Sequence, residues 1–145
     1  MKQTMVSLFV YAGLSTLAVA ADTHHRECSN ASLRGAYGFQ TGAIILPAGT
    51  PRGALGRWVF DGGGNFTNTV TLNDNGTIIQ VTDAGSYTVN ADCTGTIFPG
   101  VGGGSIEIVV VDRGNEFHLL RTAPVNQVLL FSVAKKQFPR NDEDR

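Results

Sequence analysis

The chain has 145 residues, a length typical of one domain, and 42% of them are hydrophobic, which excludes global disorder. Eleven Lys and Arg against twelve Asp and Glu give a net charge of -1. Because proteins that bind nucleic acid neutralise phosphates with an excess of basic residues, this balance predicts no nucleic-acid partner.

Residues 1–20 have the three-part layout of a secretory signal peptide. Lys2 gives a positive start, residues 5–18 are apolar, and Ala18-Val19-Ala20 supplies the small residues of a cleavage site. The apolar run is short for a membrane span, which needs about 20 residues, although an uncleaved anchor is the alternative. We therefore predict a secreted chain, periplasmic in a Gram-negative host, with one domain over residues 21–137. A flexible charged tail is expected over residues 138–145.

Short runs rich in β-branched and aromatic residues follow, separated by clusters of Gly, Asn and Asp. The runs cover residues 35–46, 54–60, 65–72, 77–82, 86–90, 94–98, 105–111, 116–122 and 127–134. Clusters such as Asp61-Gly62-Gly63-Gly64 and Asp83-Ala84-Gly85 contain residues that suit hairpin turns. This spacing predicts an all-β fold, a small antiparallel up-and-down β-barrel of eight or nine strands. Residues 47–53, with two prolines and two glycines, are expected to form a flap over one mouth.

Two of these runs, residues 105–111 and 128–133, are apolar on nearly both faces. A small barrel with a wet exterior should instead alternate apolar and polar residues. Part of the exterior is therefore expected to be covered, either by another subunit in a homo-oligomer or by the terminal segments of the same chain.

Cys28 and Cys93 are the two cysteines. In an exported chain an even pair is most simply a disulfide bond, because the compartment is oxidising. Two isolated cysteines without a Cys-x-x-Cys motif do not make a zinc site, and we expect neither a metal nor a cofactor.

The segment Cys28-Ser29-Asn30-Ala31-Ser32-Leu33-Arg34-Gly35-Ala36-Tyr37-Gly38-Phe39 resembles the opening of a family of small exported proteins, many of them bacterial and functionally uncharacterised. The family's pattern recurs in residues 60–65, 85–95, 109–116 and 134–137, so the resemblance covers nearly the whole mature chain. It implies a closed β-barrel similar to lipocalins or allene oxide cyclases, and it supports the pairing of the two cysteines. It implies no established activity.

Three residues are candidates for acid–base chemistry. Glu116 and His118 share one face of their strand, and they would form an acid–base pair if that face pointed into the barrel. The other face of that strand offers Phe117 and Leu119 to the core, in which case the pair is solvated. Glu107 shares a face with Val109, and it is either a lumen acid with a pKa raised by burial or a carboxylate paired with an arginine.

Six aromatic residues supply enough surface to line a ligand pocket or to build an ordinary core: Tyr37, Phe39, Trp58, Phe60, Phe66 and Tyr87. A barrel of about eight strands is wide enough for one small ligand, so we expect a binding protein for a small apolar molecule. The alternative is a barrel-type cyclase or isomerase that acts on a small biosynthetic intermediate. In a eukaryotic host, Asn30, Asn65 and Asn75 would be acceptors of N-linked glycans.

Overall fold

A computed structural model describes residues 27–124 and 127–139, so the proposed signal peptide and the last six residues of the charged tail lie outside the described residues. Within these ranges the chain forms eight strands and two short 3-10 helices. In chain order they are η1 (Asn30–Ser32), β1 (Arg34–Ile45), β2 (Thr50–Asp61), β3 (Asn65–Asp74), β4 (Thr77–Val89), β5 (Thr94–Pro99), β6 (Ser105–Val111), η2 (Asp112–Gly114), β7 (Glu116–Ala123) and β8 (Val128–Lys136).

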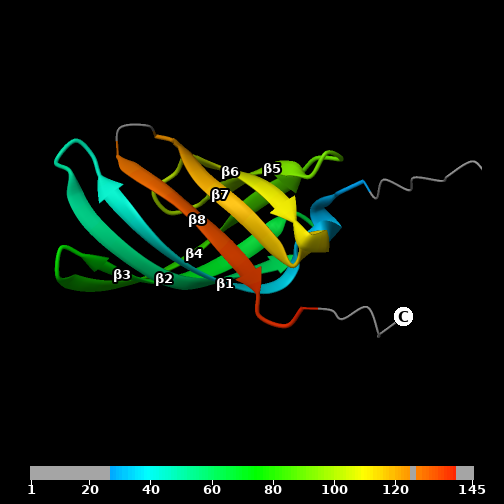
Figure 1. The fold of residues 1–145 in the computed structure, drawn as a ribbon, viewed down its shortest axis with the longest axis horizontal. Helices are drawn as coiled ribbons and strands as arrows, with labels where there is room; N and C mark the ends of the chain where they lie inside the picture. Colours follow the sequence, from blue (N-terminus) through cyan, green and yellow to red (C-terminus); the bar gives the residue numbers. More distant parts are fainter. Residues whose placement is uncertain (1–26, 125–126, 140–145) are drawn as a thin grey trace, which may run out of the picture.

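The strands form a closed antiparallel barrel in which each strand pairs with its neighbours in sequence (Figure 1). The last strand returns to the first, and the β1–β8 ladder runs from Tyr37 opposite Lys136 to Ile45 opposite Val128. This arrangement confirms the prediction of an up-and-down barrel with one disulfide bond, and within the described residues it fixes the number of strands at eight.

The predicted break at residues 83–85 is wrong, because β4 runs through them without interruption. Gly85 lies opposite Phe66 on β3 and opposite Pro99 on β5. A Cβ atom on Gly85 would lie 2.2 Å from the carbonyl oxygen of Phe98 and 2.9 Å from the Phe66 ring. The glycine therefore allows the close approach of neighbouring groups within the sheet, and it does not mark a turn.

The predicted flap over residues 47–53 is also shorter than expected. Only residues 46–49 form a turn, and β2 already begins at Thr50. Pro51 lies opposite Ile44, and Gly53 lies opposite Gly42, so these residues belong to the β1–β2 ladder. The proline is compatible with a strand here because it lies near the strand's first residue.

Aromatic rings fill the barrel around Phe60, whose side chain is almost fully buried. Its ring contacts five others with centroid distances of 4.9–6.0 Å, those of Tyr37, Trp58, Phe66, Tyr87 and Phe117. Three of the five contacts are edge-on, an arrangement that aromatic quadrupoles favour. The cluster joins residues of β1, β2, β3, β4 and β7.

One end of the barrel, here called the closed end, carries both 3-10 helices (Figure 1). The Tyr37 hydroxyl donates to the carbonyl oxygen of Gly114 in η2, and the Tyr87 hydroxyl lies 2.8 Å from the carbonyl oxygen of Leu33 beside η1. The Cys28–Cys93 disulfide bond attaches the segment before η1 to the turn between β4 and β5. Its loop of 65 residues corresponds to an upper figure of about 4 kcal/mol of stabilisation by the chain-entropy model.

Replacing Phe60 with Ala should destabilise the barrel by about 3–5 kcal/mol, because it removes the ring that the other five contact. Urea unfolding followed by fluorescence of Trp58, the single tryptophan, measures the change. Phe131→Ala is the matched control, since Phe131 is 65% exposed and its loss should cost less than about 0.5 kcal/mol. Equal losses in the two variants would contradict this view of the core.

The turn between β2 and β3 is organised by one carboxylate. Oδ1 of Asp61 accepts backbone N–H groups from Gly63, Gly64 and Asn65 at 2.7–3.0 Å, and Oδ2 accepts the side-chain amide of Asn65 at 2.8 Å. The Asn65 side chain has the largest effect, and together with the backbone donors it lowers the pKa of Asp61 from 3.8 to about 2. These bonds are stronger when the carboxylate is ionised, so their full stabilisation of the turn is present above the pKa of Asp61 in the unfolded chain.

This stabilisation should be lost as the pH falls from about 4 to about 2, between the unfolded and folded pKa values of Asp61. The melting temperature of Asp61→Asn should therefore fall less steeply across that window than that of the wild type. Asn65→Ala, which removes the side-chain bond that lowers the pKa of Asp61 most, should give an intermediate slope. Identical slopes for the wild type and Asp61→Asn would exclude a role for this carboxylate in acid unfolding.

Candidate functional site

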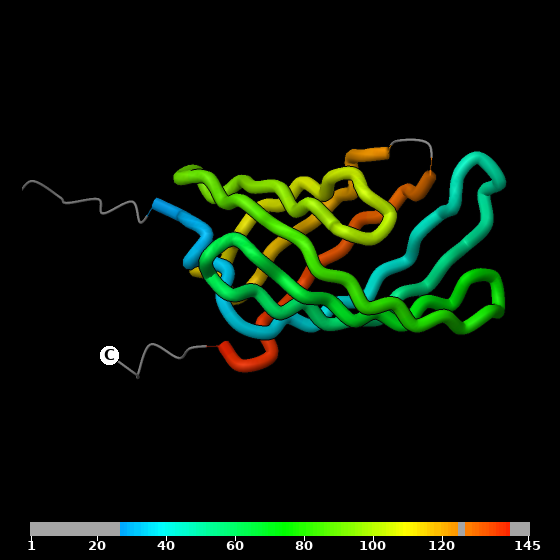
Figure 2. The backbone as a smooth tube through the Cα atoms, turned by 180° about the vertical axis from the view of Figure 1, so that it is seen from behind, coloured from blue at the N-terminus to red at the C-terminus, as the bar shows by residue number. Residues whose placement is uncertain are grey.

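The interior of the barrel changes character along its length. On β2 the inward-facing side chains pass from the buried Phe60 and Trp58 to the partly exposed Ala54 and Arg52. β3 shows the same change from Phe66 at one end to Asp74 at the other. At this end, here called the open end, the β1–β2 and β3–β4 hairpins extend beyond the rest of the barrel (Figure 2). Solvent therefore reaches the inner face above the aromatic cluster.

A row of three polar or partly polar side chains crosses the inner face between the aromatic cluster and the open end of the barrel. Trp58 lies opposite Asn68, and Asn68 lies opposite Asp83, on three adjacent strands. Residues directly opposite each other on antiparallel strands have side chains on the same face. Asn68 and Asp83 therefore point inward, as Trp58 does. We call Trp58, Asn68 and Asp83 the inner polar row.

Two atoms of the inner polar row are buried without a hydrogen-bond partner among the described residues, namely Nε1 of Trp58 and Oδ1 of Asn68. Their residues are only 4% and 7% exposed. An indole N–H is a donor and an amide oxygen is an acceptor, so two residues at opposite positions of β2 and β3 offer complementary groups. A buried polar group without a partner costs about 1–3 kcal/mol, which makes these atoms candidates for contact with a bound molecule.

The loop between β5 and β6 lies beside the open end of the barrel, and hydrogen bonds to β4 and β7 hold it in place. Oδ1 of Asp83 accepts the backbone N–H of Val101 at 2.8 Å. Arg121 of β7 donates to the carbonyl oxygen of Gly103 at 2.9 Å, while its buried Nε atom has no partner. Burial lowers the pKa of Arg121. These hydrogen bonds thus hold the loop against β4 and β7, in the stretch after β5 ends and before β6 begins.

The six aromatic residues proposed for ligand binding have different positions. Tyr37, Phe60 and Tyr87 pack in the cluster beside the hydroxyl bonds of the closed end, so they are part of a filled core. Phe39 and Trp58 pack against each other with ring centroids 5.9 Å apart, and Trp58 also contacts Phe66 at 4.9 Å. Trp58 borders the open half through the inner polar row.

Glu116 and His118 lie on the outer surface, so the solvated alternative of the sequence analysis holds. Nε2 of His118 is 3.1 Å from Oε1 of Glu116, and Nζ of Lys135 is 3.1 Å from its Oε2. The hydrogen bond from Lys135 is the main cause that lowers the pKa of Glu116. The neighbouring Phe117 and Leu119 are buried and occupy the inner face. The pair therefore does not supply an acid–base group to the lumen.

Glu107 also points outward, and Val109 on the same face is exposed. Its carboxylate accepts a hydrogen bond from Oγ1 of Thr96 at 3.2 Å. Both expectations for Glu107 are therefore wrong. Its carboxyl group does not face the lumen, and its hydrogen-bond donor is the hydroxyl group of Thr96, where an arginine was expected.

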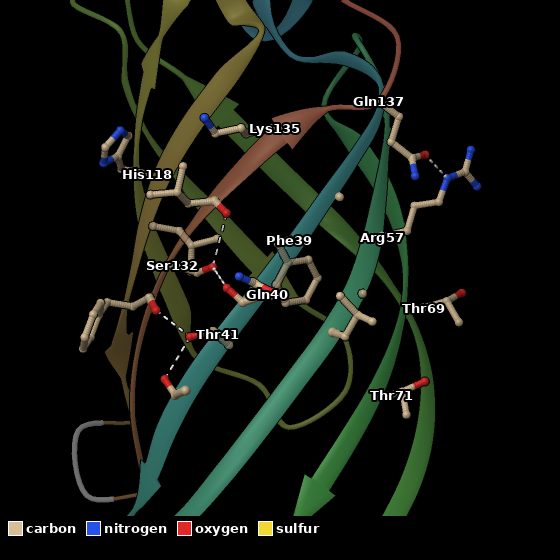
Figure 3. A pocket seen from close by; sticks show the side chains of 17 residues that line it. Phe39, Gln40, Thr41, Arg57, Thr69, Thr71, His118, Ser132, Lys135 and Gln137 are labelled. Carbon is tan, nitrogen blue, oxygen red and sulfur yellow. Dashed lines mark hydrogen bonds between the residues drawn. The ribbon is translucent and has the colours of Figure 1, made fainter.

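A groove of about 1170 Å³ crosses the outer surface from β7 and β8 over β1 and β2 to β3 (Figure 3). Its lining includes Gly38 and Gly42 of β1 and the exposed side chains of Leu55 and Phe131. Between Gln40 and Ala43 the β1–β8 ladder is interrupted. Side chains bridge this gap, because Thr41 donates to the carbonyl oxygen of Phe131 at 2.5 Å and Ser132 donates to that of Gln40 at 2.7 Å.

Of the three proposed glycan acceptors, Asn30 lies in η1, Asn65 begins β3, and Asn75 lies in the turn between β3 and β4. Oδ1 of Asn30 accepts the backbone N–H of Val89, and the Asn65 amide donates to Asp61. Asn75 is exposed in the two-residue turn between β3 and β4, with a positive φ of 49°. The side chains of Asn30 and Asn65 thus have structural roles, in η1 and in the turn between β2 and β3.

Comparison of the chain with protein-family models, with curated proteins and with solved structures gave no match. Among the described residues, no helix has the length and apolar character needed to cross a membrane. The same residues contain no group of three or more His, Cys, Asp or Glu side chains that could hold a metal ion. The function has to be inferred from the geometry of the barrel itself.

Asn68→Leu should raise the free energy of unfolding by about 1 kcal/mol, because it replaces a buried acceptor without a partner by an apolar group of similar size. Chemical denaturation measures this change. Thr67→Leu is the control, since the neighbouring Thr67 faces outward and is exposed. A clear loss of stability in Asn68→Leu would show that the Asn68 side chain stabilises the empty barrel.

Proposed function

We propose that this protein is an exported binding barrel that holds one small, largely apolar molecule in its open half. The unpartnered Trp58 Nε1 and Asn68 Oδ1 atoms on the buried inner wall are the observation that carries the proposal. Ala54, Val70 and Leu130 are partly buried apolar residues packed against the aromatic cluster. Ligand sites commonly combine apolar walls with a few convergent polar groups.

The unpartnered atoms of Trp58 and Asn68 also indicate which chemical group the ligand carries at the end that lies deepest in the barrel. A hydroxyl group can accept a hydrogen bond from Trp58 Nε1 and donate one to Asn68 Oδ1 at the same time. The rest of the molecule would contact the apolar inner wall. We therefore expect an apolar alcohol to bind better than its methyl ether, which can accept a hydrogen bond but cannot donate one.

Binding is favoured over the cyclase or isomerase alternative because the acids proposed for catalysis point away from the lumen. Export is supported by the sequence of residues 1–20, and the disulfide bond is compatible with an oxidising compartment.

Titration with N-phenyl-1-naphthylamine, a neutral apolar dye, tests the proposal directly. Dye emission should rise on binding, and Trp58 emission should fall, because the indole borders the site. The alcohol 1-decanol should displace the dye at lower concentration than its methyl ether, 1-methoxydecane. Absence of dye binding, or displacement by neither competitor, would overturn the proposal.

Two neighbouring residues of β2 provide matched variants for this titration. Ala54 faces inward and Leu55 faces outward. Ala54→Phe should fill the inner wall and weaken dye binding at least tenfold, while Leu55→Phe should leave it unchanged. Circular dichroism checks that both variants fold. If Leu55→Phe weakened binding and Ala54→Phe did not, the dye would occupy the outer groove and the lumen assignment would be wrong.

A further inference from the structure

Strand β4 is much longer than its neighbour β5, with 13 residues against 6. The β4–β5 ladder begins only at Gly85 opposite Pro99, while the β3–β4 ladder covers β4 from Thr77 onward. The loop after β5 reaches β4 at Asp83, which accepts the N–H of Val101. Within the part of the chain that the structure describes, residues 77–82, here called the β4 edge, therefore have a paired strand on one side only, and they lie in the projecting hairpin seen in Figure 2.

The hydrogen-bonding groups of the β4 edge can be assigned from the ladder. The N–H of Tyr87 donates to Gly64 on the β3 side of the strand. Because this direction alternates along an antiparallel strand, the odd-numbered residues of β4 face β3 and the even-numbered ones face away. The N–H and C=O groups of Ile78, Gln80 and Thr82 consequently point toward the free side.

The β4 edge lacks the features by which proteins usually protect an exposed edge. Its sequence, Thr77-Ile78-Ile79-Gln80-Val81-Thr82, contains no charge and no proline, and it is rich in β-branched residues. Ile78 is 63% exposed and Ile79 is 40% exposed. Charged side chains, prolines, bulges or covering segments normally prevent such an edge from pairing with another chain.

We propose that the β4 edge pairs antiparallel with the same edge of a second copy of this chain. With the two-fold axis at Gln80, Ile78 lies opposite Thr82 of the second copy, and the pairs supply about six backbone hydrogen bonds. On the other face, Ile79 lies opposite Val81 of the second copy, so apolar side chains meet apolar ones. An uncharged edge meets its own copy without like-charge repulsion, and this self-complementarity identifies the second copy as the occupant.

Sedimentation velocity of the mature protein tests the proposal, with a dimer as the expected species. Gln80→Pro removes an outward N–H without removing a bond to β3, and it should give a monomer. Gln80→Thr retains the N–H and should remain dimeric. Ile78→Lys, which brings a charge to the edge, should also give a monomer. A wild-type monomer at about 0.5 mM, a concentration at which even millimolar affinity leaves detectable dimer, would overturn the proposal.

The register has its own test. Directly opposed, hydrogen-bonded residues have Cα atoms about 5.5 Å apart, within the range of a disulfide bond. Gln80→Cys should therefore form a disulfide-linked dimer under mild oxidation. Ile78→Cys is the matched control and should not, because it lies opposite Thr82. Folded, monomeric Gln80→Cys protein, or equal cross-linking of both variants, would contradict the proposed pairing.

Discussion

The packing of five aromatic rings around Phe60 is the interaction on which the rest of the barrel depends. The rings come from five strands, so the cluster fixes the phase of each of these strands at once. A slip of one residue in any of them would turn a ring toward solvent. The same phases decide which residues face inward at the open end. Phe66 inside places Asn68 and Val70 inside, and Trp58 inside places Ala54 and Arg52 inside.

The architecture could be predicted from the sequence because closely spaced turn signals separate short runs with strand propensity. The two local differences from the structure have one cause, because Gly and Pro favour turns but also occur within paired strands. Gly85 instead accommodates Phe66 and the Phe98 carbonyl, and Pro51 lies near the start of a paired strand. The outward direction of the His118 side chain could not be predicted, because either face of its strand could point inward. Asn68 could have been identified, because it shares the inward face of Phe66 and Val70, but polar residues on both faces of β3 obscured that pattern.

The unequal lengths of β4 and β5 connect the two proposals. Where β5 ends, the wall of the barrel is lower, and the inner face of the projecting hairpins becomes accessible at the open end. The same difference leaves the β4 edge unpaired. Asp83 and Arg121 partly compensate for the missing strand pairing, because they hold the loop between β5 and β6 against β4 and β7. Pairing of two β4 edges would continue the wall of one barrel into that of the other without altering the inner polar row.

The inner polar row also bears on the choice between binding and catalysis. Asp83 is its only carboxylate, and one oxygen of that carboxylate already accepts the backbone N–H groups of Ala84 and Val101. These bonds hold the loop between β5 and β6 against β4, so this carboxylate has a structural role in the wall of the site. Trp58 and Asn68, by contrast, present a donor and an acceptor that have no partner in the described part of the chain. Groups of this kind recognise a ligand without exchanging protons with it, and for this reason the inner wall is better suited to binding than to acid–base chemistry.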